Sequence, residues 1–274
     1  MKTAQLSLVP AVVFAGMAPP CSGAEPTNHE QYMLELINRA RANGNTEAVR
    51  LGMANVNSGN PSISGVPWTI PVTGQPVVWN EQLAAAARGQ AQLLFNQNWL
   101  GATDPHTHGG TSPESRAVAA GYSLVTQPVV NGVRPGIENF AFAGNGAPYT
   151  PAQLTAQTLN LHDQLFVDAS AAGRLHRITI MNSWARDIGM GMVTGTIGGQ
   201  GRINFMMDFA KASPAAQIFL TGVVYNDTVT VNSFYSPGEG LGGLSVQAFQ
   251  NDIKIAETTT YASGGYKGCD RRLM

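Results

Sequence analysis

The sequence carries little charge. Charged residues make up 12% of its 274 positions, the formal net charge is -1, and no run of Lys or Arg exceeds two residues. Proteins that bind nucleic acid or anionic membranes present a basic patch or stripe to the phosphate groups. Because no such cluster is present, we expect no nucleic-acid partner.

Cysteine is also scarce, since only Cys21 and Cys269 occur. Cys21 lies in an N-terminal segment with the three-part layout of a secretory signal: Lys2, an apolar stretch at about residues 4–18, and then small residues. Cleavage after Ala24 would remove Cys21 and leave no pair for an internal disulfide. We therefore expect an exported protein, of a composition typical of bacteria, whose stability depends on its core.

Two other fates of this segment are disfavoured. Lipid attachment at Cys21 is opposed by Pro20, which stands where a small residue is required. An uncleaved anchor is opposed by the length of the apolar stretch, which is shorter than the roughly 20 residues that span a bilayer.

Helical periodicity dominates the first two thirds of the chain. Apolar residues at helical spacing predict helices over residues 28–43 and 79–97, and Pro after a capping hydroxyl predicts two more helix starts. The expected punctuation is Asn28 and Gly44 around the first helix, Asn80 before the second, Ser112-Pro113 before a short third and Thr150-Pro151 before the fourth.

Strand patterns are confined to the later part. Residues 52–76 have no periodicity and predict a surface insertion. From Ile188, two apolar runs separated by Gly-Gly-Gln-Gly predict an antiparallel hairpin. Helices followed by a hairpin, without alternating strand and helix units, indicate an α+β fold.

A second composition begins after residue 212. Short β-branched runs between Gly, Pro, Asn and Asp predict a small all-β module over residues 217–266, followed by a polar tail at 267–274. The module is short for a closed sandwich, so we expect it to be partial or truncated. It resembles prealbumin-like, carboxypeptidase-regulatory or adhesin-repeat surface modules of bacterial proteins.

Five histidines are the main candidates for chemistry. His29 lies in a first helical turn and is expected at the surface. His106 and His108 stand two positions apart, so both can point the same way in extended chain and hold zinc, although a solvated turn is the commoner outcome. His176 follows a glycine before a predicted apolar strand, where a structural histidine satisfied by a backbone carbonyl is the commoner case.

Glu138 stands among apolar residues in "RPGIENFAFAG". Its carboxylate either points outward from a buried strand or is held at a site, and periodicity favours the first. No Gly-x-Ser-x-Gly elbow, His-Glu-x-x-His motif or Walker loop is present to indicate an enzyme class.

Six stretches between residues 28 and 212 resemble, in order, the CAP superfamily of secreted domains, which includes the cysteine-rich secretory, antigen 5 and plant pathogenesis-related proteins. They are "QYMLELINRARA", "WNEQLAAAARGQAQ", "HTHGGTSPESRAVAAGYS", "IENFAFA", "HRITIMN" and "IGMGM…INFMMDFA". The resemblance implies an α-β-α sandwich over residues 25–212 after a signal peptide at 1–24.

The resemblance also implies a central cleft of two histidines and two acids that can take a divalent cation. His106, Glu138 and His176 match three of these positions. The fourth, an acid on the preceding helix, has no clean match: Asp163 is nearest, Asp168 lies where bacterial members often carry Asp, and His108 and His162 are less favoured ligands. Zinc is the expected ion in the cleft, with His106 and His176 as its main ligands.

In the β module, Asp227, Asn232 and Glu239 offer oxygen ligands suited to calcium. Turn preference of Asp and Asn, with a solvated Glu239, explains them equally well.

Three functions remain open. The first is a secreted binding protein whose cleft takes a cation and a small-molecule, lipid or protein ligand. The second is a metal-assisted hydrolase of peptidase type, with Glu138 as general base. The third is a cell-surface adhesive or structural protein that acts through the β module. Because no nucleophile is identifiable, binding is favoured over catalysis.

Overall fold

The computed structural model describes residues 24–99, 101, 103–213 and 219–269. The predicted signal segment, apart from Ala24, and the last five residues of the predicted tail lie outside the described residues. Over the described part, every helix is too short or too polar to span a bilayer. The helices are α1 (Asn28–Ala42), α2 (Gly44–Arg50), α3 (Glu81–Asn96), α4 (Pro113–Ala119), α5 (Pro151–Val167), the 3-10 turn η1 (Ala172–Arg174) and α6 (Leu175–Ile180).

A four-stranded sheet forms the middle layer, in the order β3-β5-β6-β4. Its strands are β3 (Val78–Trp79), β5 (Asp187–Ile197), β6 (Gln200–Ala210) and β4 (Glu138–Asn145). β5 and β6 form the predicted hairpin, and β4 pairs antiparallel with β6 along its whole length. A separate ribbon, β1 (Ser62–Ile63) with β2 (Val66–Pro67), lies in the segment between α2 and β3.

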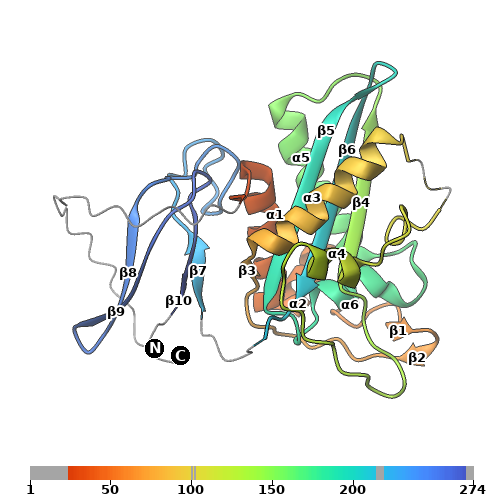
Figure 1. Ribbon diagram of the computed structural model, residues 1–274, viewed down its shortest axis with the longest axis horizontal. Coiled ribbons are helices and arrows are strands. Elements are labelled where there is room, and N and C mark those ends of the chain that lie inside the picture. Colours follow the sequence, from red (N-terminus) through yellow and green to blue (C-terminus); the bar gives the residue numbers. More distant parts are fainter. Residues whose placement is uncertain (1–23, 100, 102, 214–218, 270–274) are drawn as a thin grey trace.

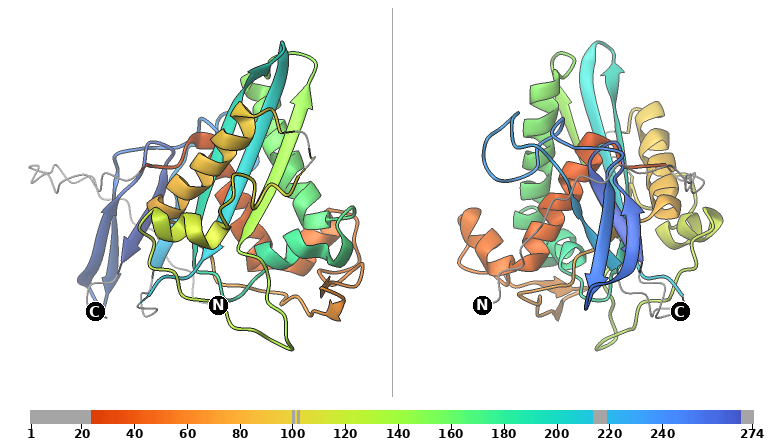
Figure 2. Two further views of the ribbon diagram at one scale, coloured as in Figure 1. Left: turned by 45° about the vertical axis from the view of Figure 1, so that its right-hand side comes forward. Right: turned by 90° about the vertical axis from the view of Figure 1, so that its left-hand side faces the viewer.

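Helices cover both faces of this sheet (Figures 1 and 2). α3 and α4 lie on one face, and α1, α2 and α5 lie on the other. The apolar stripes of α1 and α5 pack on the sheet because residues such as Met33, Ile37 and Leu161 are buried against Phe205 and Phe209. The α+β prediction is therefore confirmed, and its layers are those of an α-β-α sandwich.

Close approach of α3 to β5 depends on two glycines. A Cβ on Gly189 would lie 2.0 Å from the backbone nitrogen of Ala84, and one on Gly191 would lie 2.4 Å from the Cα of Arg88. The "GMG" motif thus lets the helix backbone lie directly on the strand.

Most expected helix starts are confirmed. The side chains of Asn80, Ser112 and Thr150 each accept a backbone hydrogen bond in the first turn of their helix. At α1, however, the cap is Thr27 and not Asn28, because Thr27 and Glu30 form a reciprocal capping box.

Three further expectations were wrong. Gly44 begins α2, since Asn43 is extended and caps that helix with its side chain. Residues 176–180 form helix α6 and not a strand. The segment 52–76 is not only a surface insertion, because Val56, Ile63 and Ile70 are buried in the main core.

The C-terminal part is built of two antiparallel ribbons, β7 with β10 and β8 with β9. β10 continues past residue 266, where the module was expected to end. Figure 1 shows these ribbons beside the first helix and the β3 edge of the sandwich. Tyr235 packs on Tyr32 and Leu36 of α1, and Lys267 Nζ donates to the Trp79 carbonyl at 3.1 Å, so the ribbons dock on the sandwich. The strands are β7 (Phe219–Val223), β8 (Ser245–Gln250), β9 (Ile253–Thr259) and β10 (Gly265–Cys269).

Candidate functional site

The loop that carries His106 is fixed from two sides. Gln90 of α3, which is buried, donates its side-chain amide to the carbonyls of Pro105 at 2.7 Å and His108 at 3.0 Å. Arg116 of α4 donates to the carbonyl of His106 at 2.8 Å. The loop is therefore held by α3 on both sides of His106 and by α4 at His106 itself, and the His106 ring is placed at the start of β4.

Glu138, the first residue of β4, receives that ring. Nδ1 of His106 lies 2.8 Å from Oε1 of Glu138, and Arg116 Nη2 donates to Oε2. Glu138 is only 6% exposed, so the interpretation that it points outward from its strand was wrong. Its burial follows from the two partners, which satisfy both carboxylate oxygens and compensate the charge.

Asp208 is an acidic neighbour of Glu138 that was not predicted from the sequence. It faces Glu138 across the β4–β6 ladder, is fully buried, and has no hydrogen-bond partner for either carboxylate oxygen among the described residues. Burial, followed by the adjacent Glu138 carboxylate, raises the pKa of Asp208 well above its ordinary value. The signal in the sequence was a single acid inside the apolar run "INFMMDFA".

His176 forms a second pair of the same kind. Its Nδ1 lies 2.8 Å from Oδ1 of Asp168, and its backbone N–H donates to Oδ2 at 2.9 Å. Asp168 is buried and ends α5 in the left-handed conformation, at φ 52°. Asp168, and not Asp163, is thus the acid that contacts His176.

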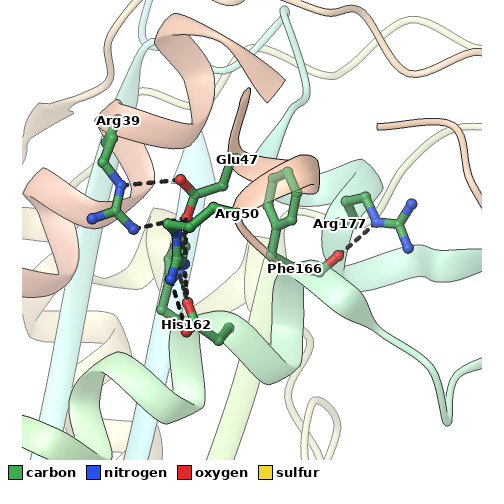
Figure 3. A network of polar contacts seen from close by, with 7 residues as sticks. Arg39, Glu47, Arg50, His162, Phe166 and Arg177 are labelled. Atoms are coloured by element: carbon green, nitrogen blue, oxygen red, sulfur yellow. Dashed lines mark hydrogen bonds and ion pairs between the residues drawn. The ribbon is translucent and has the colours of Figure 1, made fainter. Parts of the chain in front are cut away.

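The end of α5 is held in place for this contact by a buried arginine. Arg177 donates to the carbonyl of Phe166 at 2.6 Å (Figure 3) and to that of Val167 at 2.6 Å. Since Arg177 follows His176 directly, the same turn of α6 positions both the histidine and its carboxylate partner.

The two histidine–carboxylate pairs are linked at β4. Asn139, next to Glu138, donates its side-chain amide to the carbonyl of His176 at 3.0 Å. The side chains of His106 and His176 are 30% and 31% exposed, and Nε2 of each ring has no hydrogen-bond partner among the described residues. Each histidine therefore keeps one ring nitrogen free.

Asp163 and His162 belong to a different cluster, on α5 facing α2. Ligand atoms of Glu47, His162 and Asp163 lie within 4.8 Å of one another, which is the only such trio of His, Cys, Asp or Glu among the described residues. His106, Glu138, His176 and Asp168 do not converge in this way. The structure thus joins each candidate histidine to one acid without bringing three ligand atoms together.

Two arginines neutralise this second cluster (Figure 3). Arg39 and Arg50 both bind the buried carboxylate of Glu47, and Arg50 also binds Asp163. Although burial acts to raise it, the hydrogen bonds from the arginines bring the pKa of Glu47 below its ordinary value. A cation could take this trio, but it would have to displace Arg50 from two carboxylates.

His108 differs from His106 in that both of its ring nitrogens are engaged. Nδ1 lies 3.0 Å from Thr103 Oγ1, and Nε2 contacts the side-chain oxygen of Gln97. This arrangement anchors the loop to the end of α3.

The oxygen ligands expected for calcium are used by the backbone. Asp227 accepts from the N–H groups of Asn232 and Ser233, and Asn232 Oδ1 accepts from Phe234 N–H. Glu239 is buried and accepts from the N–H groups of residues 229, 230 and 236. These contacts order the loops of the C-terminal ribbons, which favours the turn-forming interpretation, although Glu239 is not solvated as that interpretation assumed.

Comparisons with known proteins give a match for the α-β-α sandwich. The model of the cysteine-rich secretory protein family matches residues 34–209, which is more than half of the chain. No curated protein matches. Among solved structures, an extracellular protein containing an SCP domain from Bacillus anthracis str. Ames aligns with 48% of this chain at 13% identity and a TM-score of 0.26. The alignment spans 34% of that neighbour's length.

The family match covers the elements that carry both histidine–carboxylate pairs, from the middle of α1 to the end of β6. It does not extend to the C-terminal ribbons, whose prealbumin-like fold is not confirmed. The chain belongs to the cysteine-rich secretory protein family, the CAP family.

Proposed function

We propose that this chain is a secreted CAP-family binding protein that holds a divalent cation, zinc in the first instance, through Nε2 of His106 and Nε2 of His176. The cation would contribute to recognition of a small-molecule, lipid or protein ligand at the same cleft. Export is supported by the signal-like N-terminal sequence and by the family.

One observation carries the proposal: each histidine is oriented through Nδ1 by a buried carboxylate and leaves Nε2 free. Histidines that bind metals usually give their other ring nitrogen to a carboxylate or carbonyl, which fixes the ring and makes it a better ligand. Here Glu138 and Asp168 have that orienting role and are not themselves ligands. Water or the bound ligand would complete the four positions that zinc takes.

Catalysis is less well supported by the same geometry. A general base needs a carboxylate oxygen that can reach a water molecule. Both oxygens of Glu138 are occupied, one by His106 and one by Arg116. The hydrolase alternative would be supported by turnover of peptide substrates that is lost in Glu138→Gln, and unchanged turnover in that variant would refute Glu138 as the base.

The test is a zinc titration by calorimetry on the purified chain without chelator. His106→Ala and His176→Ala should each weaken binding by at least about 100-fold, while Asp168→Asn should weaken it by about 10- to 100-fold through the orientation of His176. His108→Ala is the comparison variant from the same loop and should weaken zinc binding much less than His106→Ala, because both ring nitrogens of His108 are engaged within the protein.

Two results would refute the assignment. If His108→Ala weakens binding more than His106→Ala, the wrong histidine has been chosen. If His162→Ala abolishes binding while His176→Ala does not, zinc binds the cluster of Glu47, His162 and Asp163, with Arg50 displaced.

The adhesive alternative concerns the C-terminal ribbons, for which a partial prealbumin-like or adhesin-like module at residues 217–266 remains a prediction. Calcium binding there would be supported by a calcium-dependent rise of the melting temperature that Asp227→Asn removes.

A further inference from the structure

A pocket of about 360 Å³ lies beside the candidate site, and neither the proposed ligands His106 and His176 nor the orienting Glu138 lines it. Its walls come from the start of α4, from the connection between α4 and β4, and from the turn after α6. Volumes of about 300 to 1,000 Å³ are usual for small-molecule sites. The residues that matter for its chemistry are Glu114, Leu124, Gln127, Arg134, Ile137 and Trp184.

The connection that forms most of the wall has a defined backbone. Leu124 bridges to Ala212, and Val125 N–H donates to the Lys211 carbonyl at 2.9 Å, which attaches the first part of the connection beyond the end of β6. Farther on, Val130 and Val133 pair around an Asn-Gly turn. The pocket is therefore built by backbone hydrogen bonds and does not depend on a free loop.

Gln127 is the first indication that the pocket receives a polar ligand. It is only 7% exposed, and its side-chain oxygen is buried without a hydrogen-bond partner among the described residues. A buried amide without partners costs about 1 to 3 kcal/mol, so such groups are normally satisfied. Gln127 is placed to bond whatever occupies the pocket.

The charges on the wall are the second indication. Arg134 and Glu114 both line the pocket, yet neither forms an ion pair within 4.0 Å with the other or with any described residue. Trp184 and Ile137 supply apolar surface in the same pocket. One cationic group, one anionic group, an amide and an apolar wall thus face a single occupant.

We infer that this pocket binds a short peptide with free termini and an apolar side chain, of about dipeptide size. The terminal carboxylate pairs with Arg134, the terminal ammonium pairs with Glu114, and the peptide group bonds to Gln127. The apolar side chain lies on Trp184 and Ile137. Two residues of extended chain place the two terminal charges about 7 Å apart, so one peptide can meet two wall charges that do not lie within 4.0 Å of each other. A fatty acid would leave Glu114 without a partner.

The probe is the dipeptide Leu-Phe, titrated into the full chain by calorimetry beside its N-acetylated and C-amidated forms. Each blocked form should bind at least about 10-fold more weakly, because one terminal charge pair is lost. In Arg134→Gln the free acid and the amide should bind equally, and in Glu114→Gln the free amine and the acetylated form should bind equally. Glu114 is half-buried and Arg134 is exposed, so neither variant removes a core contact.

Arg186→Gln and Asp252→Asn are the matched controls, since both residues are exposed and outside the pocket. They should leave the binding of all three peptides unchanged. Absence of binding at millimolar Leu-Phe would overturn the inference, as would equal binding of the free and blocked peptides to the wild type. Tighter binding of decanoate than of Leu-Phe would overturn it in favour of an anionic lipid. None of these results depends on zinc, so failure here is distinguishable from failure of the metal proposal.

Discussion

Glu35 should make the stability of this protein fall as the pH rises. It lies on α1 beside the C-terminal ribbons, and Gln31 donates to its Oε1 at 2.7 Å. Burial raises the pKa of Glu35 from 4.5 to about 7, against which the hydrogen bond from Gln31 acts only in part. The nearby carboxylate also adds to burial in raising the pKa of Tyr235, which places it close to the contact between α1 and the ribbons.

The sign and size of this change in the free energy of unfolding follow from the linkage between protonation and folding. Because the folded state holds the proton of Glu35 more tightly than the unfolded state, the stabilisation is fully present below pH 4.5. It is lost as the pH rises through about 7. Each pH unit between the two pKa values is worth about 1.4 kcal/mol, so the loss is about 3 kcal/mol at most. The amide of Glu35→Gln resembles the protonated acid at every pH, so this variant should keep the stabilisation that the wild type loses.

The assay is urea denaturation of the wild type and Glu35→Gln at intervals from pH 4 to pH 8. Other acids also titrate, so the quantity to follow is the difference in the free energy of unfolding between the two proteins. That difference should be near zero at pH 4 and should reach about 2 to 3 kcal/mol in favour of Glu35→Gln at pH 8. Asp252→Asn, at the exposed β8–β9 turn, should show no such divergence. Parallel pH profiles for the wild type and Glu35→Gln would refute the reasoning.

Two further predictions, one on the packing of α3 against β5 and one on the hydrogen bonds of a buried arginine, are checked by the same denaturation at neutral pH. Gly189→Ala should destabilise by at least about 3 kcal/mol, because the new Cβ would meet the Ala84 backbone at 2.0 Å. Gly89→Ala, in α3 with open space around it, should stabilise by about 0.5 to 1 kcal/mol; a loss there would contradict the packing described. Arg41→Met should cost about 3 kcal/mol or more, because the buried guanidinium donates to four backbone carbonyls that would lose their donor. The exposed Arg186→Gln should change stability by less than about 0.5 kcal/mol, and an equal loss in both variants would show that burial of Arg41 is not the cause.

The helix starts and the β5–β6 hairpin were predictable because their signals are local in the sequence. Asn80, Ser112 and Thr150 cap their helices because a capping side chain acts on backbone N–H groups two or three residues away. The β5–β6 hairpin was predictable since its turn, Gly198-Gly199, requires the positive φ that glycine adopts readily. The order of these elements also carried the resemblance to the family that the match over residues 34–209 then showed.

The tertiary structure alone decided which acids meet which histidines. Glu138 is buried beside His106 because Arg116, from a helix earlier in the chain, satisfies its second oxygen. Asp208 joins them only through the β4–β6 register, which pairs residues far apart in sequence. Asp168 reaches His176 because α5 ends in a left-handed turn, whereas Asp163, one turn earlier, faces Arg50. Spacing along one chain cannot fix such pairings, because they depend on how strands and helix ends are brought together by packing.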